Sequence, residues 1–251
     1  MTLVDHLFIF IIVAVHPVAG YVSYQKLVRQ ARAGEVIDRS RLYEMSILQQ
    51  WTLFGICLAL WAGSGRSWET LGFTFELAPY FAAGAALAVA ATVALYLQYR
   101  QVTTASREDL DRYRESVGTL DLIIPRNGNE LGRFNALSVT AGIVEETLWR
   151  GFLIWYLMAF MPVWVAAIVS SVAFGIAHAY QGPRNIPKIA LVGGVFAAVF
   201  LLTGSLWLAM LLHAVMDIVQ GRVGYELFRR TDGDPPATTD ANDESDLTEP
   251  A

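Results

Sequence analysis

The feature that most constrains this chain is the arrangement of its apolar residues in blocks of about the length of a membrane span. A helix needs roughly 20 residues to cross a hydrocarbon core of about 30 Å, and such blocks follow one another along the 251 residues. Hydrophobic residues make up 55% of the chain and charged residues only 16%, whereas soluble domains are about one quarter charged. We therefore predict a single all-helical, polytopic membrane bundle.

Seven spans are predicted, at about 5–24, 45–64, 78–98, 134–158, 163–180, 187–203 and 205–221. The last two belong to one apolar stretch, in which Thr203-Gly204-Ser205 predicts a tight hairpin between two short helices. A possible eighth helix, half-buried or interfacial, is placed around 218–229. The first block is predicted to be a retained span rather than a signal peptide, because no Lys or Arg precedes Lys26 and no convincing cleavage site follows it.

The basic residues predict the orientation of the bundle. With seven alternating spans, all but Arg66 and Arg150 of the 18 Lys and Arg residues fall on one side. The excess of positive charge in cytoplasmic loops then places the N-terminus outside and the C-terminus in the cytoplasm. The preference for Arg over Lys and the Ala-rich spans favour a prokaryotic plasma membrane as the location.

Three regions are predicted along the chain. Residues 1–131 form an N-terminal three-span region that ends in a cytoplasmic amphipathic segment, 132–230 a C-terminal core, and 231–251 an acidic, disordered tail. The net charge of −5, without an aromatic-interleaved basic patch, argues against nucleic acid as a partner. A single cysteine, Cys57, provides neither a disulfide framework nor a Cys-based zinc site.

Six ionisable residues fall inside the late predicted spans, where a charge costs about 2.5–3.5 kcal/mol on insertion scales. They are Glu145, Glu146, Arg150, His178, His213 and Asp217. One polar residue in a span is often interhelical glue, but six in three of the C-terminal spans predict a functional site. His16, alone beside Pro17, is interpreted as structural or interfacial instead.

Helical spacing divides these six residues into two groups. Glu146 and Arg150 are four residues apart and can form an ion pair on one helix face. Glu145 is rotated by about 100° from Glu146, which leaves its carboxylate free as the working residue. His213 and Asp217 also share a face. Two histidines, a free glutamate and an aspartate that converge from three helices could activate water.

Three short motifs, in this order and each in a late span, resemble the CPBP family of intramembrane proteases, which includes Rce1-like CAAX proteases and bacteriocin-processing endopeptidases. The motifs are Glu145-Glu146-x-x-x-Arg150, Phe174-x-x-x-His178 and His213-x-x-x-Asp217. The resemblance covers roughly 132–221, and it identifies the C-terminal core as catalytic. It implies an all-helical membrane core around a cytoplasm-facing cavity in which a peptide bond is hydrolysed.

Carried over by position, the resemblance implies a role for each motif residue. Glu145 would be the general base that activates water, and His178 would assist it. His213 and Asp217 would stabilise the tetrahedral oxyanion or orient the substrate. The remaining three residues, Glu146, Arg150 and Phe174, would support the site.

Asp217 raises a question about a metal. Rce1-like relatives often carry Asn at this position, and an ionised aspartate would repel an oxyanion, so Asp217 must be protonated, orient His213 or bind a metal. Glu145, His178, His213 and Asp217 could together hold zinc, although the His-Glu-x-x-His helix of zincins is absent. We favour metal-free, glutamate-dependent hydrolysis, which requires no cofactor.

The predicted partners are the lipid bilayer and a membrane-associated peptide or protein that serves as substrate. Prenylated CAAX proteins are not expected as substrates in a prokaryote. Two other classes of function stay open at this point. The chain could be a catalytically silent scaffold or immunity-type partner, or a proton- or metal-coupled transporter that uses the same buried carboxylates and histidines.

Overall fold

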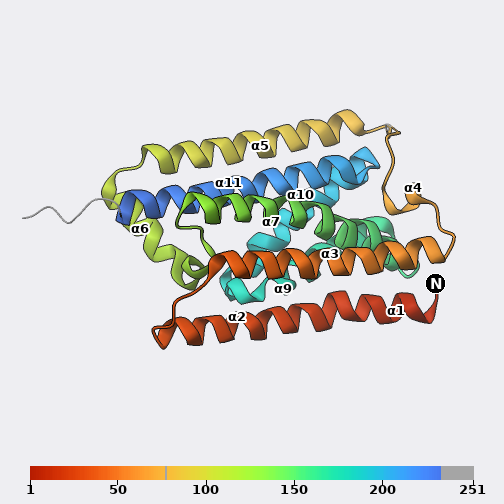
Figure 1. Cartoon of the computed structure of the whole chain (residues 1–251). Coiled ribbons are helices and arrows are strands. Elements are labelled where there is room, and N and C mark those ends of the chain that lie inside the picture. Colours follow the sequence, from red (N-terminus) through yellow and green to blue (C-terminus); the bar gives the residue numbers. More distant parts are fainter. Residues whose placement is uncertain (77, 233–251) are drawn as a thin grey trace, which may run out of the picture.

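A computed structural model describes residues 1–76 and 78–232 of the chain. The described residues form helices joined by short connections and include no strand, which confirms the all-helical prediction. Figure 1 shows the helices running side by side along one direction, with the N-terminus at one end of the bundle and the end of the last helix at the other.

The N-terminal half begins with one continuous helix of 30 residues. It consists of α1 (Leu3–Phe10), a π-helical segment (Ile11–Val15) and α2 (His16–Arg32). Next come α3 (Arg39–Gly63), the short α4 (Trp68–Leu71) and α5 (Phe81–Thr104). The polar segment that follows forms α6 (Arg107–Val117) and a 3-10 turn (Gly118–Ile123).

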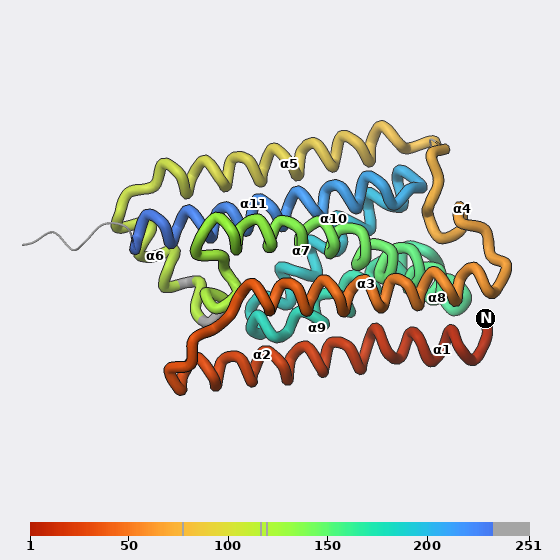
Figure 2. Tube along the Cα trace, viewed as in Figure 1, coloured from red at the N-terminus to blue at the C-terminus, as the bar shows by residue number. Residues whose placement is uncertain are grey.

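The C-terminal half opens with α7 (Gly128–Glu146), which continues through a π-helical segment (Thr147–Leu153) into α8 (Ile154–Leu157). Helix α9 (Val163–Ala177) follows, and two 3-10 turns (Ala179–Gln181 and Pro183–Asn185) lead into α10 (Ile186–Thr203). The last helix of the described part is α11 (Leu206–Asp232). Figure 2 traces how α7 and α11 lie beside each other in the middle of the bundle.

Among the described residues, five helices are long and apolar enough to cross a membrane: Leu3–Arg32, Arg39–Gly63, Phe81–Thr104, Pro183–Thr203 and Leu206–Asp232. They correspond to five of the seven predicted spans. The other two are the run from α7 to α8, which contains five charged residues, and α9, which is apolar but has only 15 residues. Large apolar side chains such as Val18, Leu191 and Leu211 are mostly exposed on the outside of the bundle, as lipid-facing residues would be.

The predicted hairpin between the last two spans is confirmed. Helix α10 ends at Thr203, Gly204 adopts a left-handed conformation with φ of +70°, and α11 begins at Leu206. Glycine tolerates this conformation because it has no Cβ. The chain therefore reverses its direction within the two residues between α10 and α11.

The prediction of a separate eighth helix around 218–229 was wrong, because α11 continues without a break to Asp232. The reason is packing: Leu227 and Phe228 are 3% and 2% exposed, and Leu227 packs with Val102 and Leu110 of α5 and α6. Two residues of the predicted tail, Thr231 and Asp232, also belong to α11. The rest of that tail, 233–251, lies outside the described residues.

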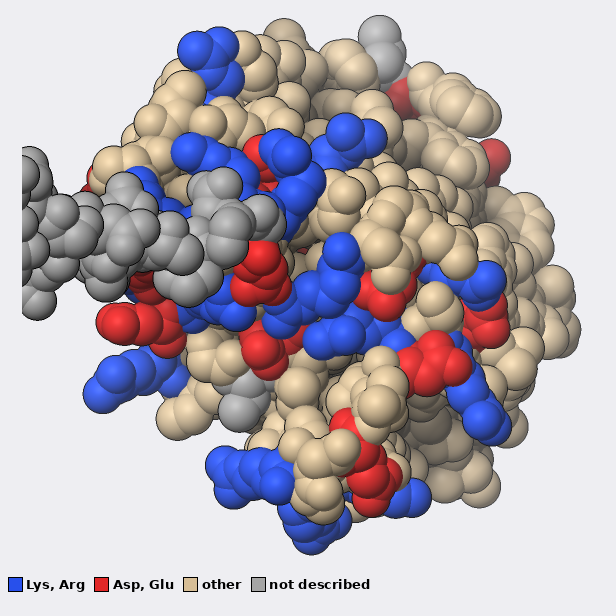
Figure 3. Space-filling view, turned by 60° about the vertical axis from the view of Figure 1, so that its left-hand side comes forward, with Lys and Arg blue, Asp and Glu red and all other residues tan. Residues whose placement is uncertain are grey.

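Charged side chains gather at one end of the bundle. Figure 3 shows Lys, Arg, Asp and Glu spread across the end where α6 and the last turns of α11 lie, while the flanks are largely uncharged. There Arg114 and Arg126 both pair with Asp232, and Arg230 donates to backbone carbonyls at the end of α5. Burial is the main cause that lowers the pKa of Arg126. At this end Arg114 therefore joins α6 to α11, and Arg230 joins α11 to α5.

Candidate active site

The two adjacent glutamates lie at the last turn of α7, where the backbone changes from α-helix to π-helix at Thr147. Single π-helical turns inside α-helices often mark functional sites, because they widen the helix and redirect its side chains. The helix itself starts from a side-chain cap, in which Asn127 Oδ1 accepts a hydrogen bond from the backbone N–H of Glu130 at 2.9 Å. Helix α7 packs between α11 and α3, so neighbours surround the two carboxylates.

Glu146 and Arg150 form a fully buried ion pair, as their spacing predicted. Arg150 Nη1 donates to Glu146 Oε1 at 2.9 Å, and both side chains are 0% exposed. Arg150 Nη2 donates to the backbone carbonyl of Gly193 on α10 at 3.0 Å. Because an unpaired buried charge is very costly, these contacts explain how an arginine is held at this depth.

His213 joins this buried pair from α11. Its Nδ1 lies 2.7 Å from Glu146 Oε1, and its side chain is 4% exposed. The spacing had grouped His213 only with Asp217, whose Oδ2 lies 3.6 Å from His213 Nε2. The ring therefore has a carboxylate at each nitrogen, one buried and one partly exposed, and these two contacts fix its orientation.

Aromatic rings enclose the buried group. The Arg150 guanidinium lies 4.4 Å from the ring centre of Phe174 and 5.3 Å from that of Phe196. Phe196 also stacks on His213, with ring centres 4.7 Å apart and planes inclined by 16°. Such contacts add cation–π attraction. Sequence reasoning included Phe174 but missed Phe196, although its spacing of three residues from Gly193 places both on one face of α10.

Glu145 has different neighbours from Glu146. Gln50 Nε2 of α3 donates to Glu145 Oε1 at 3.2 Å, and His178 Nε2 lies 4.0 Å from Glu145 Oε2. A separation of 4.0 Å is too long for a direct hydrogen bond and suits a bridging water. Gln50 was not predicted as a site residue. The only feature of the sequence that could have indicated a role for Gln50 was the presence of a polar glutamine in an apolar span.

The structure brings His178 to the site at the end of α9. His178 is the C-terminal cap of that helix, and its Nδ1 lies 2.8 Å from the backbone carbonyl of Phe174. A carbonyl only accepts, so it favours the tautomer with the proton on Nδ1. The Nε2 atom then carries the lone pair and faces Glu145.

Exposure separates the six predicted residues into an accessible and a buried set. The side chains of Glu145 and His178 are each 19% exposed and that of Asp217 is 32% exposed, whereas Glu146, Arg150 and His213 are nearly or fully buried. Solvent and substrate can therefore reach the first set directly. The second set can act only through its neighbours.

Tyr180 is a further residue at the site that the sequence did not single out. Its ring centre lies 5.9 Å from that of His178, and Gln181 Nε2 donates to its hydroxyl at 3.2 Å. A tyrosine hydroxyl is protonated at neutral pH, so that of Tyr180 can donate a hydrogen bond.

The four residues considered as zinc ligands do not form a ligand set. Within residues 1–76 and 78–232, no three His, Cys, Asp or Glu side chains are grouped so that they could hold a metal ion. Glu145 faces His178 and Asp217 faces His213 as two pairs, whereas a zinc site takes three or four protein ligands. The arrangement does not fit a zinc centre.

Comparison with known proteins identifies the C-terminal part of the chain. Residues 127–219 match the family described as type II CAAX prenyl endopeptidase Rce1-like, and this segment contains all three motifs. The resemblance to the CPBP and CAAX proteases is therefore confirmed. No curated protein and no solved structure matches the chain. The family implies a peptidase that acts in a membrane.

Proposed function

We propose that this chain, in which residues 127–219 are Rce1-like, hydrolyses a peptide bond of a membrane-associated peptide or protein by using Glu145 to activate water. One observation carries this proposal. Of two adjacent glutamates, Glu146 is fully buried and its Oε1 contacts Arg150 and His213, whereas Glu145 is partly exposed and faces His178 across 4.0 Å. A general base must be reachable by its water, and only Glu145 meets that requirement.

In the proposed step, one water molecule lies between Glu145 and His178. The Glu145 Oε2 and the His178 Nε2 lone pair each accept one of its hydrogens, so that an oxygen lone pair points away from both towards the substrate carbonyl carbon. Glu145 takes a proton as the carbon–oxygen bond forms. The tetrahedral intermediate then breaks its carbon–nitrogen bond, and the proton passes from Glu145 to the leaving amine.

The other residues position this pair or the substrate. Gln50 fixes one oxygen of Glu145 through its hydrogen bond, and the buried group of Glu146, Arg150 and His213 joins α7, α10 and α11. Asp217, at 3.6 Å from His213 Nε2, orients that ring in our proposal rather than stabilising the oxyanion. The oxyanion then needs a neutral or positive donor, for which the Tyr180 hydroxyl is a candidate.

The test is a cleavage assay with purified protein and a library of membrane peptides. We expect Glu145→Gln to lower kcat by at least about a hundredfold, the usual scale for removal of a general base, and His178→Ala to lower it as well. Glu108→Gln is the matched control, since that carboxylate is 85% exposed on α6, away from the site. Unchanged cleavage by Glu145→Gln would contradict the proposed mechanism.

The same assay distinguishes the other classes of function. A transporter would show no cleavage, and the Glu145 and His178 variants would lose proton-driven uptake in liposomes. A silent scaffold would show neither activity, and the variants would lose a partner complex instead.

We also propose that hydrolysis needs no metal. Glu145, His178, His213 and Asp217 meet as two pairs, not as a ligand set. Cleavage is therefore expected to continue at an unchanged rate after dialysis against a chelator such as EDTA. Loss of activity that returns on addition of zinc, with about one zinc per chain by elemental analysis, would contradict this expectation.

A further inference from the structure

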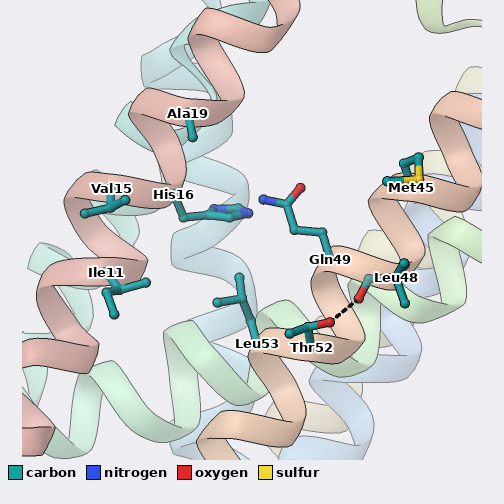
Figure 4. A pocket seen from close by; sticks show the side chains of 9 residues that line it. All are labelled: Ile11, Val15, His16, Ala19, Met45, Leu48, Gln49, Thr52 and Leu53. Atoms are coloured by element: carbon teal, nitrogen blue, oxygen red, sulfur yellow. Dashed lines mark hydrogen bonds between the residues drawn. The ribbon is translucent and has the colours of Figure 1, made fainter.

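A groove of about 400 Å³ runs along the outside of the bundle between the first helix and α3. Figure 4 shows its two walls, in which His16 and Ala19 of α2 face Gln49 and Thr52 of α3, with aliphatic side chains filling the rest. Its size is that of a pocket for a small ligand or a few peptide residues. Both helices are long and apolar enough to cross a membrane, so this groove lies at the depth of the lipid.

His16 and Gln49 point towards each other across this groove (Figure 4). Neither side chain has a hydrogen-bond partner among the residues that the structure describes. Thr52 differs, because its hydroxyl already donates to the backbone carbonyl of Leu48 at 2.8 Å. A polar group in lipid without a partner is costly, so an imidazole and an amide placed opposite each other indicate a polar ligand.

Neither Glu145 nor His178 lines the groove, but helix α3 connects the groove to the proposed catalytic pair. Gln49 and Gln50 are neighbours on α3. The Gln49 side chain lines the groove, and the Gln50 side chain donates a hydrogen bond to Glu145. His16 is also close enough to Glu145 and His178 for electrostatic interaction with both. A chain that lies in the groove would therefore pass beside Glu145.

We propose that this groove binds an extended segment of the substrate main chain, and that His16 and Gln49 hydrogen-bond its peptide groups. The inference rests on the proposed function and specifies its substrate as an apolar, membrane-embedded peptide segment that enters from the lipid. A segment must unfold locally to be cleaved, and its freed N–H and C=O groups then need partners inside the membrane. Gln49 offers both a donor and an acceptor, as does a neutral His16, and the aliphatic walls suit apolar side chains.

A hydrocarbon chain in the same groove would interact differently with His16 and Gln49. It has no hydrogen-bonding group, so it would gain nothing from His16 or Gln49 and would bind more tightly to leucine at either position. The two occupants therefore predict opposite effects of the same substitutions.

The test measures KM and kcat for an apolar model peptide in proteoliposomes. We expect His16→Leu and Gln49→Leu each to raise KM about three- to tenfold, the loss of one hydrogen bond, with kcat nearly unchanged. Gln98→Leu is the matched control, because Gln98 is a glutamine of another apolar helix that pairs with Gln220, and its KM should stay the same. A lowered or unchanged KM in both groove variants would overturn the proposal.

A blocking experiment covers the case in which these variants fold poorly. Cysteine is introduced at Ala19 in the groove or at Val18, which is 63% exposed on the same helix, in a Cys57→Ala background, and each protein is treated with a bulky maleimide. We expect the label at 19 to abolish peptide cleavage and the label at 18 to leave it intact. Equal activity of both labelled proteins would overturn the groove proposal alone. Absence of cleavage by the unlabelled parent would overturn the proposed function, and the groove proposal with it.

Discussion

At the scale of single residues, two neighbours of the same type have opposite environments. Glu145 and Glu146 differ in direction by about 100° around the helix axis. That rotation turns Glu146 towards Arg150 and His213 in the dry centre of the bundle and Glu145 towards Gln50 and His178 at its partly exposed edge. Burial and partners, rather than residue type, assign support to one and the proposed chemistry to the other.

Gly193 and Gly194 offer a test of this buried support. A Cβ on Gly193 would lie 3.0 Å from Arg150 Nη2 and 3.1 Å from Phe174 Cδ1, whereas a Cβ on Gly194 would meet nothing within 4 Å. We expect Gly193→Ala to destabilise the protein by about 1–3 kcal/mol, the usual scale of overpacking, and to lower peptide cleavage. Gly194→Ala should do neither. Thermal unfolding in detergent and the cleavage assay measure both effects, and identical behaviour of the two variants would show that Arg150 can move freely.

At the scale of secondary-structure elements, the site depends on how closely α7 approaches α11. Small residues let membrane helices pack with their backbones close together. Gly142 is such a residue: a Cβ there would lie 2.7 Å from the Met210 carbonyl oxygen and 2.9 Å from the Ala214 backbone nitrogen. This contact lies one turn from Glu146 and brings it within reach of His213.

Gly142→Ala should therefore push α11 away from α7, because backbone atoms cannot turn aside as a flexible side chain can. We predict a loss of stability of about 1–3 kcal/mol and a weakened Glu146–His213 contact, with reduced cleavage as the readout. Gly132→Ala on the same helix is the control, since its Cβ would lie in open space; there the loss of glycine flexibility should stabilise the helix by about 0.5–1 kcal/mol. Full activity in Gly142→Ala would contradict the close-packing argument.

At the scale of the whole molecule, the distribution of charge gives the bundle two unlike ends. Most basic residues lie on the connections and helix ends around α6, the α2–α3 connection and the end of α11, as Figure 3 shows for that end. At the opposite end Arg66 is neutralised by two hydrogen bonds to the buried Asp5 carboxylate, at 2.8 and 2.6 Å. One arginine in this connection is far outnumbered by the basic residues at the other end, and the positive-inside rule depends on that difference in Lys and Arg.

The orientation that follows is tested by labelling single cysteines in a Cys57→Ala background. Ser64 lies in the connection after α3 and Arg112 in α6, and both positions are exposed. An impermeant maleimide applied to intact cells should label Ser64→Cys at once and Arg112→Cys only after the membrane is opened. The reverse pattern would invert the proposed topology, with the N-terminus inside.

The sequence by itself determined what depends on local spacing and on average hydropathy. The approximate positions of the five long apolar helices, the Gly204 hairpin and the ion pair of Glu146 with Arg150 follow from residues that are near one another in the sequence, and the structure has all three. The three motifs also predicted the family that residues 127–219 match. Hydropathy alone could not place the end of α11, because polar residues beyond 218 look like a boundary until their apolar neighbours pack.

Only the tertiary structure decided which distant side chains meet. His213 was grouped with Asp217 by spacing, yet its shorter contact is with Glu146, 67 residues away, and Gln50 reaches Glu145 across 95 residues. His16 likewise changed from an isolated structural residue to a wall of the groove beside α3. The physical reason is that such contacts depend on the rotation and separation of whole helices, which the combined packing of many side chains sets and no local pattern encodes.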